Sequence, residues 1–466
     1  MKTELNYLEN SILVIFGISG DLSKRKILPA IYHLIKDGMV PSKTIIIGTS
    51  RKDVSLDVLM KDVELCVLEE SKVCDQETLL KFKKMLSIIK FDPIDMNDYL
   101  LLKKRFNDIE EQYKECFNRL YYLSVPPDSV EPIIKKLGLS GLNKSCQHNQ
   151  GKSRLLIEKP FGNDLSSASY LIKEISKFFK EDQIFRIDHY LAKETAQNIF
   201  AFRKHNPVFW KLWDKNSISS IEIKAFEKIG IENRVNFYEH MGALKDLVQS
   251  HLLQLLSLIT MEIDPNKSTK SSDIHSAKLK LLTQVIPLNK RTIKELKVGQ
   301  YKGYKKEVSN PKTKVETYIK LKLEINNKRW LGTPIFLETG KALNKKTTEI
   351  NINFKSKNIK QTNTLTFRIQ PNEGIDIKLI VKEPGLIDKL KETYMDFSYQ
   401  TTFHQSTHPD AYERVLVDAF KGDQTLFATS SEVIASWKIL EPLLKFWDKN
   451  PKKLIIYKEG LNPTNI

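Results

Sequence analysis

An unbroken apolar run that ends in a glycine turn constrains the fold of this chain more than any other feature. Residues 12–16 read ILVIF and are followed by the turn Gly17–Asp21 and then by a helical pattern, LSKRKILPAIYHL. A strand without polar positions is typical of one buried on both faces in a parallel sheet. Glycines at such a junction permit a tight turn and a close approach of the backbone to a ligand. The free N–H groups that begin the helix then favour an anion such as a pyrophosphate.

The end of the next apolar run indicates which dinucleotide such a turn would bind. The turn reads GxxGD rather than GxGxxG, so a plain strand–turn–helix remains an alternative to a nucleotide site. Residues 44–48 read TIIIG and are followed by Thr49-Ser50-Arg51. An Arg at this strand end suits the 2′-phosphate of NADP, whereas an acidic residue suits NAD. Arg51 therefore favours NADP, although Asp53 could reach a ribose and a solvated surface Arg is the alternative.

The pattern of apolar residues changes part way along the chain, and this change predicts two domains. Up to about residue 187, short apolar runs alternate with helical stretches, which is typical of a parallel α/β sheet. Later segments alternate apolar and polar residues, as antiparallel strands with one wet face do. We expect an α/β domain first and then an α+β domain, with the boundary near residues 185–200. The Lys-rich segment 288–307 is expected to be an excursion on the surface of the second domain. The candidate strands are Ile12–Phe16, Thr44–Ile47, Leu120–Val125 and Arg154–Ile157, then Ser220–Phe226, Thr317–Ile325, Glu349–Phe354, Thr364–Ile369 and Ile375–Val381.

Length, charge and cysteine usage narrow the class of protein. The chain has 466 residues and a net charge of +17, so it can form two domains and favours an anionic partner. No apolar run approaches the roughly 20 residues that span a bilayer, and the first ten residues lack a secretory pattern. The four cysteines, Cys66, Cys74, Cys116 and Cys146, form no CxxC pair. We therefore expect reduced thiols, no zinc ribbon, no disulfide framework and a cytoplasmic protein.

Two polar segments in the middle of the chain are candidates for binding a phosphorylated ligand. Lys159 follows a predicted strand, and ligands of open α/β sheets bind at the carboxyl ends of the strands. In the segment 188–194, DHYLAKE, a helix that begins near Tyr190 would place His189 and Lys193 on adjacent turns, as a phosphate pocket requires. The alternatives are a solvated strand-end lysine and an Asp188 that caps the start of a surface helix.

A histidine on an apolar helix stripe is the candidate general base. The stripe comprises Leu244, Leu247, Val248, Leu252, Leu255 and Leu256, and His251 lies on it. A lone histidine there is either a core residue or a base in a partly dry cleft, its ring oriented by a carboxylate. Asp188 is the candidate for that carboxylate.

These segments together resemble glucose-6-phosphate 1-dehydrogenase, a family that oxidises a sugar phosphate in the first step of the oxidative pentose phosphate pathway. The resemblance covers nearly the whole chain, and the segment RIDHYLxKE is highly specific by itself. The matching stretches are GISGDLSKRKILPA, GTSR, YYLSVPP, RLLIEKPFG, FRIDHYLAKETAQNI, the GAxxDxxQxH helix, TGKALNKK and HPDAYERVLVDAFKGDQTLF.

The resemblance implies a Rossmann-like NADP-binding domain at 1–187 and a larger domain at 188–466, built on an antiparallel sheet with helices, for substrate binding and dimerisation. The active site lies between the two domains in this family. The implied cofactor residues are Gly17, Ser19, Gly20, Asp21, Leu22, Arg51, Asp95 and Lys159. Lys159 also meets the substrate, and the other implied substrate residues are His189, Tyr190, Lys193, Glu227, Asp246, Lys341 and Lys346. His251 matches the catalytic base and Asp188 its carboxylate partner.

The implied reaction begins when His251 takes the proton of the C1 hydroxyl of glucose 6-phosphate while Asp188 stabilises the imidazolium. A hydride then leaves C1 for NADP, and 6-phosphoglucono-1,5-lactone forms. The resemblance also implies a homodimer or homotetramer, with no metal, nucleic acid or membrane as a partner.

The chain departs from the family pattern at several positions, none of which removes a catalytic group. They are Ile18, Ala192, Phe237, Glu239, Ser250 and Ala342. Two other functions compete with the dehydrogenase. A nucleic-acid-binding protein would carry a basic stripe interleaved with aromatic residues, which the sequence lacks. A catalytically impaired homologue would be expected to lack His251, Asp188 or Lys193, and all three are present.

Overall fold

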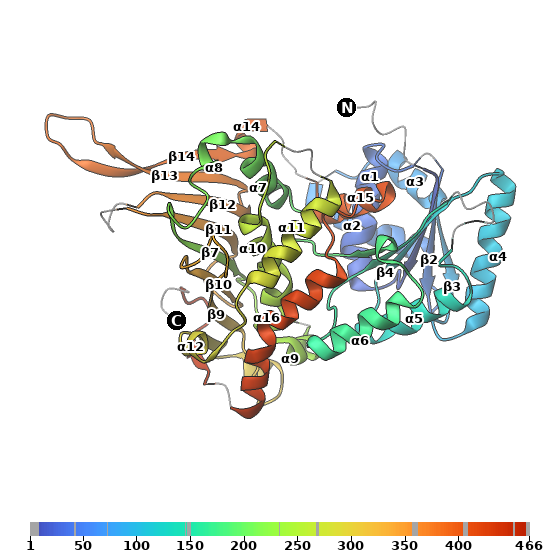
Figure 1. Cartoon of the computed structure of the whole chain (residues 1–466). Helices are drawn as coiled ribbons and strands as arrows, with labels where there is room; N and C mark the ends of the chain where they lie inside the picture. The colour runs from blue at the N-terminus through green and yellow to red at the C-terminus, as the bar shows by residue number, and fades with distance from the viewer. Residues whose placement is uncertain are drawn as a thin grey trace. The chain divides into compact units, whose positions relative to one another are not determined.

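The computed structural model divides the chain into two compact units (Figure 1). Unit 1 comprises Met1–Gly162, Ser166–Ala192 and Pro409–Ser430, and unit 2 comprises Asn163–Leu165, Lys193–His408 and Ser431–Ile466. The structure describes residues 9–41, 43–71, 73–144, 146, 151–232, 234–266, 270–356, 362–403, 409–450 and 453–462. None of the helices in these ranges has the length and apolar character needed to cross a membrane.

Unit 1 is built on a six-stranded parallel sheet with the order β3-β2-β1-β4-β5-β6. Figure 1 shows helices α1, α2, α3 and α15 on one side of this sheet and α4, α5 and α6 on the other. Every residue of β1 is buried, which confirms the parallel sheet predicted from the apolar run. The strands are β1 Ser11–Phe16, β2 Thr44–Ser50, β3 Leu86–Lys90, β4 Asn118–Leu123, β5 Ser153–Ile157 and β6 Ile184–Arg186. The helices are η2 Ser23–Ile27, α1 Leu28–Lys36, α2 Leu56–Ser71, α3 Gln76–Met85, α4 Met96–Tyr113, α5 Pro127–Leu139, α6 Leu165–Ser176, η3 Glu181–Gln183 and α15 Ala411–Lys421.

A late segment of the chain completes unit 1. Helix α15 packs in the same apolar core as α1 through Val415, Leu416 and Phe420. Arg154, which is buried on β5, donates from Nη1 to the carbonyl oxygens of Ala419 and Phe420 at 2.8 Å. The predicted assignment of cofactor binding to residues 1–187 and of substrate binding to residues 188–466 stays a prediction.

Unit 2 is built on a nine-stranded sheet with the order β14-β13-β12-β11-β7-β10-β9-β8-β15. Most neighbours are antiparallel, but β7 pairs with β10 and β8 with β15 in parallel, so the sheet is mixed rather than purely antiparallel. The strands are β7 Ile218–Phe226, β8 Lys297–Tyr301, β9 Tyr318–Leu323, β10 Ile335–Gly340, β11 Thr347–Phe354, β12 Thr364–Gln370, β13 Gly374–Lys382, β14 Leu390–Ser398 and β15 Ile455–Tyr457. The helices are α7 Glu194–His205, α8 Pro207–Trp210, α9 Val235–Ala243, η4 Leu244–Leu252, α10 Leu253–Thr260, α11 Ser271–Gln284, α12 Lys290–Lys294, α13 Tyr304–Glu307, α14 Tyr399–Phe403 and α16 Ser430–Lys449.

The alternating segments predicted as strands are strands in the structure, and their apolar positions form the core of unit 2. On β11 and β12, Ile350, Ile352, Leu365 and Phe367 are buried while the residues between them are partly exposed. The prediction for 288–307 is wrong in part, because Lys297–Tyr301 forms β8 inside the sheet. The lysines around this strand hid its short apolar pattern.

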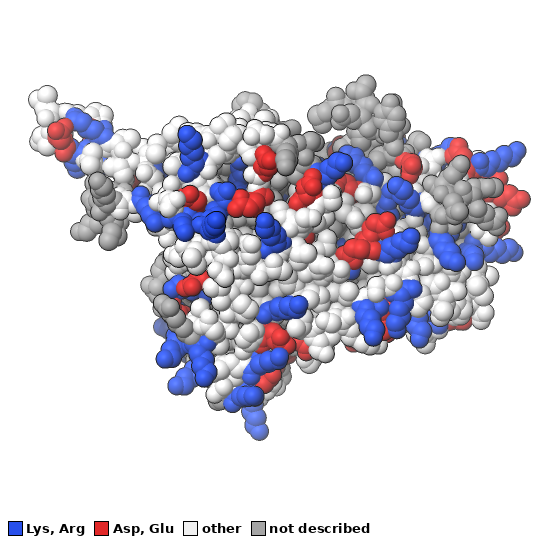
Figure 2. All heavy atoms as spheres, viewed as in Figure 1, with Lys and Arg blue, Asp and Glu red and all other residues white. Residues whose placement is uncertain are grey.

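The excess of positive charge is distributed over the surface. Figure 2 shows Lys and Arg side chains interspersed with Asp and Glu on the face in view. Several lysines form surface ion pairs, such as Lys24 with Asp62 and Lys43 with Glu115, each at 2.7 Å. Pairs of this kind contribute little to stability. The charge therefore does not mark a single binding surface on this face.

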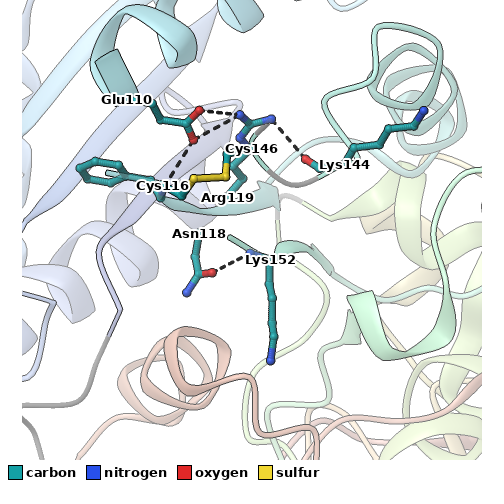
Figure 3. Close-up of a disulfide and its surroundings, with 8 residues drawn as sticks. Glu110, Cys116, Asn118, Arg119, Lys144, Cys146 and Lys152 are labelled. Carbon is teal, nitrogen blue, oxygen red and sulfur yellow. Dashed lines mark hydrogen bonds and ion pairs between the residues drawn. A yellow bond between two sulfur atoms is a disulfide. The ribbon is translucent and has the colours of Figure 1, made fainter. Parts of the chain in front are cut away.

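The expectation of four reduced thiols is wrong for two of them. Cys116 and Cys146 form a disulfide, whereas Cys66 and Cys74 are free (Figure 3). The two bonded cysteines lie before β4 and after α5, and a spacing of 30 residues gave no signal for the pairing. Beside the disulfide, buried Arg119 donates to both carboxylate oxygens of Glu110 at 3.2 and 3.0 Å.

Removal of this disulfide will destabilise the protein. We expect the variant Cys116→Ala/Cys146→Ala to lose about 2–4 kcal/mol of unfolding free energy, because the bond restricts a loop in the unfolded chain. The matched control is Cys66→Ala/Cys74→Ala, which removes two partly exposed free thiols and should stay within about 1 kcal/mol of wild type. Urea denaturation without reductant measures both. Four titratable thiols in the native wild-type protein would contradict the pairing.

Candidate functional site

The glycine turn after β1 has the close backbone contacts of a ligand cradle. Gly17 has a φ of +81°, and a Cβ on it would lie 2.3 Å from the carbonyl oxygen of Ser124. Gly20 N–H donates to Gly17 O at 3.0 Å, and Ser23 Oγ lies 3.0 Å from both Gly17 O and Ser124 Oγ. Both the positive φ and the close approach require glycine at position 17.

This turn lies at the switch point of the sheet. The strand order reverses direction between β1 and β4, and open α/β sheets bind their ligands at such a point. The turn leads directly into η2 and α1, so the helix N–H groups that begin at the turn are available to an anion. Ser19 and Asp21 are exposed there, and Gly20 and Leu22 are partly exposed. The cradle therefore fits a dinucleotide pyrophosphate.

The departure at Ile18 is accommodated by the neighbouring strand. Ile18 is fully buried, and a Cβ on Gly48 would lie 2.6 Å from its Cγ1. The glycine that ends TIIIG thus makes room for the larger side chain. Ile18 therefore leaves the turn intact.

The other predicted cofactor residues lie at the carboxyl ends of β2, β3 and β5. Arg51 and Asp53 are exposed beyond β2. Asp95 is the N-cap of α4, and its Oδ1 accepts from Asn97 N at 3.0 Å, which gives this side chain a structural role. Lys159 follows β5 in a cis peptide bond with Pro160 and is partly exposed.

Glu158, beside Lys159, is a candidate functional residue that the sequence analysis did not identify. It is partly buried, and Tyr122 Oη donates to its Oε1 at 2.6 Å. Burial raises the pKa of the Glu158 carboxyl to about 7, although the Tyr122 hydrogen bond and Lys159 act in the opposite direction. Its position directly before Lys159 was the only signal in the sequence.

The segment 188–193 is a turn rather than the start of a helix. Helix α7 begins at Glu194 with Lys193 as its N-cap, so the prediction that His189 and Lys193 lie on adjacent helical turns is wrong. Asp188 is buried, and its Oδ1 accepts from Tyr190 N at 3.0 Å. The ring of His189 lies 5.0 Å from that of Tyr190, edge to face. Asp188, His189 and Tyr190 belong to unit 1, and Lys193 belongs to unit 2.

In unit 2, the stripe that carries His251 begins as a π-helix. The chain kinks at Gly242, where φ is +63° and a Cβ would lie 2.5 Å from Glu316 Oε1. The same Glu316 oxygen accepts from Leu244 N at 3.1 Å, which anchors the start of η4. A π-helix bonds residues five apart, so Asp246 and His251 lie one turn apart along the helix. Both side chains are buried, as the apolar stripe predicts for His251.

A pair of parallel strands brings Glu227 and Lys341 together. Phe226 is opposite Gly340 at the carboxyl ends of β7 and β10, and the residue that follows each strand is a member of the pair. The two side chains form an ion pair, and Lys341 Nζ also lies 4.0 Å from Asp246 Oδ2. The Lys341 side chain is only 1% exposed, so the carboxylates compensate for the cost of burying its ammonium. Lys346 is exposed in the turn before β11.

Two of the other departures have structural explanations. Glu239 accepts from Tyr304 Oη at 2.6 Å and from Thr313 Oγ1 at 2.9 Å, so its longer side chain reaches the loop after α13. Ser250 Oγ donates to Asp246 O at 3.0 Å along the π-helix. Neither departure disturbs the buried positions of Asp246 and His251.

Comparison with known protein families covers almost the whole chain. The model of the glucose-6-phosphate dehydrogenase NAD binding domain matches residues 14–198, and that of the glucose-6-phosphate dehydrogenase C-terminal domain matches residues 200–465. The chain belongs to the glucose-6-phosphate dehydrogenase family.

Individual relatives agree with this membership. The glucose-6-phosphate 1-dehydrogenase of Chlamydia pneumoniae is 38% identical, with 94% of this chain and 90% of that one aligned. The enzyme of Aggregatibacter actinomycetemcomitans is 39% identical over 94% and 91% of the two chains. A solved structure of glucose-6-phosphate dehydrogenase in complex with glucose 6-phosphate superimposes with a TM-score of 0.89, at 33% identity over 97% of this chain and 95% of that one.

Proposed function

We propose that this chain oxidises D-glucose 6-phosphate to 6-phospho-D-glucono-1,5-lactone with NADP as the hydride acceptor. The observation that carries the proposal is the match of both family domains over residues 14–198 and 200–465. The homologous structure with glucose 6-phosphate bound supports the choice of substrate. The glycine turn and the buried Lys341 cluster are the local features that such a reaction requires.

The residues of unit 1 fit NADP. Gly17 and Gly20 carry no side chain, so the backbone of the turn can approach a pyrophosphate closely. Arg51 would hold the 2′-phosphate, and Ser19, Asp21, Leu22, Asp95 and Lys159 would complete the proposed cofactor site. When bound, NADP supplies the acceptor for the hydride from C1.

The side chains of this chain bind the sugar and move one proton. His251 would accept the proton of the C1 hydroxyl at an imidazole nitrogen, and burial shields that nitrogen from water. Glu227, Asp246, Lys341 and Lys346 would orient the sugar, and His189, Tyr190 and Lys193 would bind its phosphate, which anchors the substrate away from the reacting carbon. The pairing of Asp188 with His251 stays a prediction.

The basic nucleic-acid-binding protein is not favoured as an alternative. The face shown in Figure 2 intersperses basic and acidic side chains rather than forming a basic stripe. The impaired homologue is not favoured either, since the predicted base and the buried cation are in place.

We propose that the chain forms a homodimer or homotetramer through the edge of the unit 2 sheet. Strand β14 is the edge strand, and the hairpin β13–β14 extends away from the rest of the sheet in Figure 1. Its apolar residues Leu386, Ile387, Tyr394 and Met395 are exposed, and such residues on an edge strand favour association. Sedimentation equilibrium at the mass of one chain would exclude this proposal.

The proposed compartment is the cytoplasm. Two relatives in Arabidopsis thaliana, each 35% identical, are named as cytoplasmic glucose-6-phosphate 1-dehydrogenases. The disulfide Cys116–Cys146 would then lie in a compartment that keeps most thiols reduced. Fractionation of the source cells tests the proposal.

The function is tested by substitution of the proposed base. Wild type should reduce NADP in the presence of glucose 6-phosphate, and His251→Asn should lower kcat by roughly 10²–10⁴, the usual contribution of a general base. The matched control is His240→Asn, an exposed histidine on α9. Absorbance at 340 nm measures all three. Near-normal turnover of His251→Asn would remove this residue from its role.

The cofactor preference is tested at Arg51. Arg51→Ala should raise the KM for NADP by roughly 10- to 100-fold, since a charged hydrogen bond to the 2′-phosphate is lost, and leave the KM for NAD nearly unchanged. Lys52→Ala, at the exposed neighbouring position, is the control. Equal losses for NADP and NAD would show that Arg51 does not bind the 2′-phosphate.

A further inference from the structure

Tyr238, on helix α9, has a buried hydroxyl that makes no hydrogen bond within the described part of the chain. Its side chain is fully buried. The nearby tyrosines of the same aromatic cluster are satisfied: Tyr304 Oη donates to Glu239 at 2.6 Å, and Tyr457 Oη donates to Lys341 O at 2.7 Å. A buried hydroxyl without a partner costs folding free energy, and such groups are rare in native proteins.

The ring of Tyr238 lies beside the buried ammonium of Lys341. Lys341 Nζ lies 5.1 Å from the centre of the ring, within the range of a cation–π interaction. The ring therefore adds a third stabilising partner to the carboxylates of Glu227 and Asp246, which face the same ammonium. This contact adds to the interactions that stabilise the buried ammonium.

The hydroxyl of Tyr238 is available as a donor. Burial, followed by the charges of Asp246 and Glu316, raises the pKa of the Tyr238 phenol well above its usual value, so the group stays protonated. The contact of Asp246 with Lys341 is long, at 4.0 Å, and is easily given up when Lys341 engages another acceptor. A carboxylate accepts several hydrogen bonds, so Asp246 can then accept one from Tyr238, a nearby protonated group whose hydroxyl has no partner in the described part of the chain.

We propose that Tyr238 is a positioning residue of the sugar-phosphate site: its ring holds the Lys341 ammonium, and its hydroxyl donates to Asp246 once a bound sugar engages Lys341. The proposal rests on the proposed function. It explains why a tyrosine stands where a phenylalanine would fill the same space without an unpaired hydroxyl.

The test compares two conservative substitutions in the same aromatic cluster. Tyr238→Phe should leave the melting temperature of the free protein unchanged or slightly higher, because it removes an unpaired group. It should raise the KM for glucose 6-phosphate by roughly 10- to 100-fold, the contribution of one hydrogen bond to a charged group, with kcat and the KM for NADP nearly unchanged. Tyr304→Phe is the control, since it removes a satisfied hydroxyl: it should lower the melting temperature and leave the KM for the sugar unchanged.

A double substitution tests the route through Asp246. In an Asp246→Asn background, Tyr238→Phe should cause less than a twofold further change in KM, because the charged acceptor is gone. Additive losses, an unchanged KM in Tyr238→Phe, or a loss of stability equal to that of Tyr304→Phe would each overturn the proposal. The comparison of melting temperatures needs no substrate. Failure of the proposed function would instead appear as absent turnover in wild type.

Discussion

The buried ammonium of Lys341 is the interaction on which the functional part of unit 2 depends. An isolated charge is costly to bury, so the surrounding structure must supply partners for it. The parallel pairing of β7 and β10 places Glu227 next to it, and the π-helix η4 presents Asp246. The kink at Gly242, fixed by Glu316, sets where that π-helix begins. The strand pairing, kink and aromatic layer of unit 2 therefore meet at one charge.

Unit 1 meets a different constraint, which is to bring backbone N–H groups close to a phosphate without a side chain in the way. The reversal of strand order between β1 and β4 opens the sheet at that point, and Gly17 lets the turn pass against Ser124. The backbone N–H groups make the contact with the phosphate, so the side chain at position 18 can vary. Ile18 fits because Gly48 has no side chain where Ile18 packs. The two units thus differ in what they offer a ligand: unit 1 presents backbone N–H groups at the glycine turn, and unit 2 holds a buried cation among carboxylates.

Local pattern predicted much of this structure. The apolar run at 12–16 and the alternating segments at 349–354 and 364–369 are strands in the structure. They could be predicted because a strand buried on both faces is apolar throughout, and a strand buried on one face alternates apolar and polar residues. The buried position of His251 also followed from the apolar stripe on which it lies. The family resemblance identified candidate residues directly after β7 and β10 and on η4 that no local pattern links.

Features that depend on distant partners could not be predicted in this way. The disulfide joins residues 30 apart with no motif, α15 belongs to the core of unit 1 although it begins at Ala411, and β8 has polar neighbours on both sides. The start of α7 at Glu194 was misplaced because Asp188 resembles an N-cap, yet its Oδ1 accepts from Tyr190 N within a turn. The unpaired hydroxyl of Tyr238 is a property of tertiary packing alone.

The central claim is that the buried side chain of Lys341 contributes to the binding of glucose 6-phosphate. This contribution is independent of the cofactor site in unit 1. Titration calorimetry of Lys341→Met, with the exposed neighbour Lys345→Met as control, tests this claim most directly. The account predicts that Lys341→Met weakens glucose 6-phosphate binding by at least about tenfold and leaves NADP affinity within about twofold of wild type. Wild-type affinity of Lys341→Met for glucose 6-phosphate would contradict it.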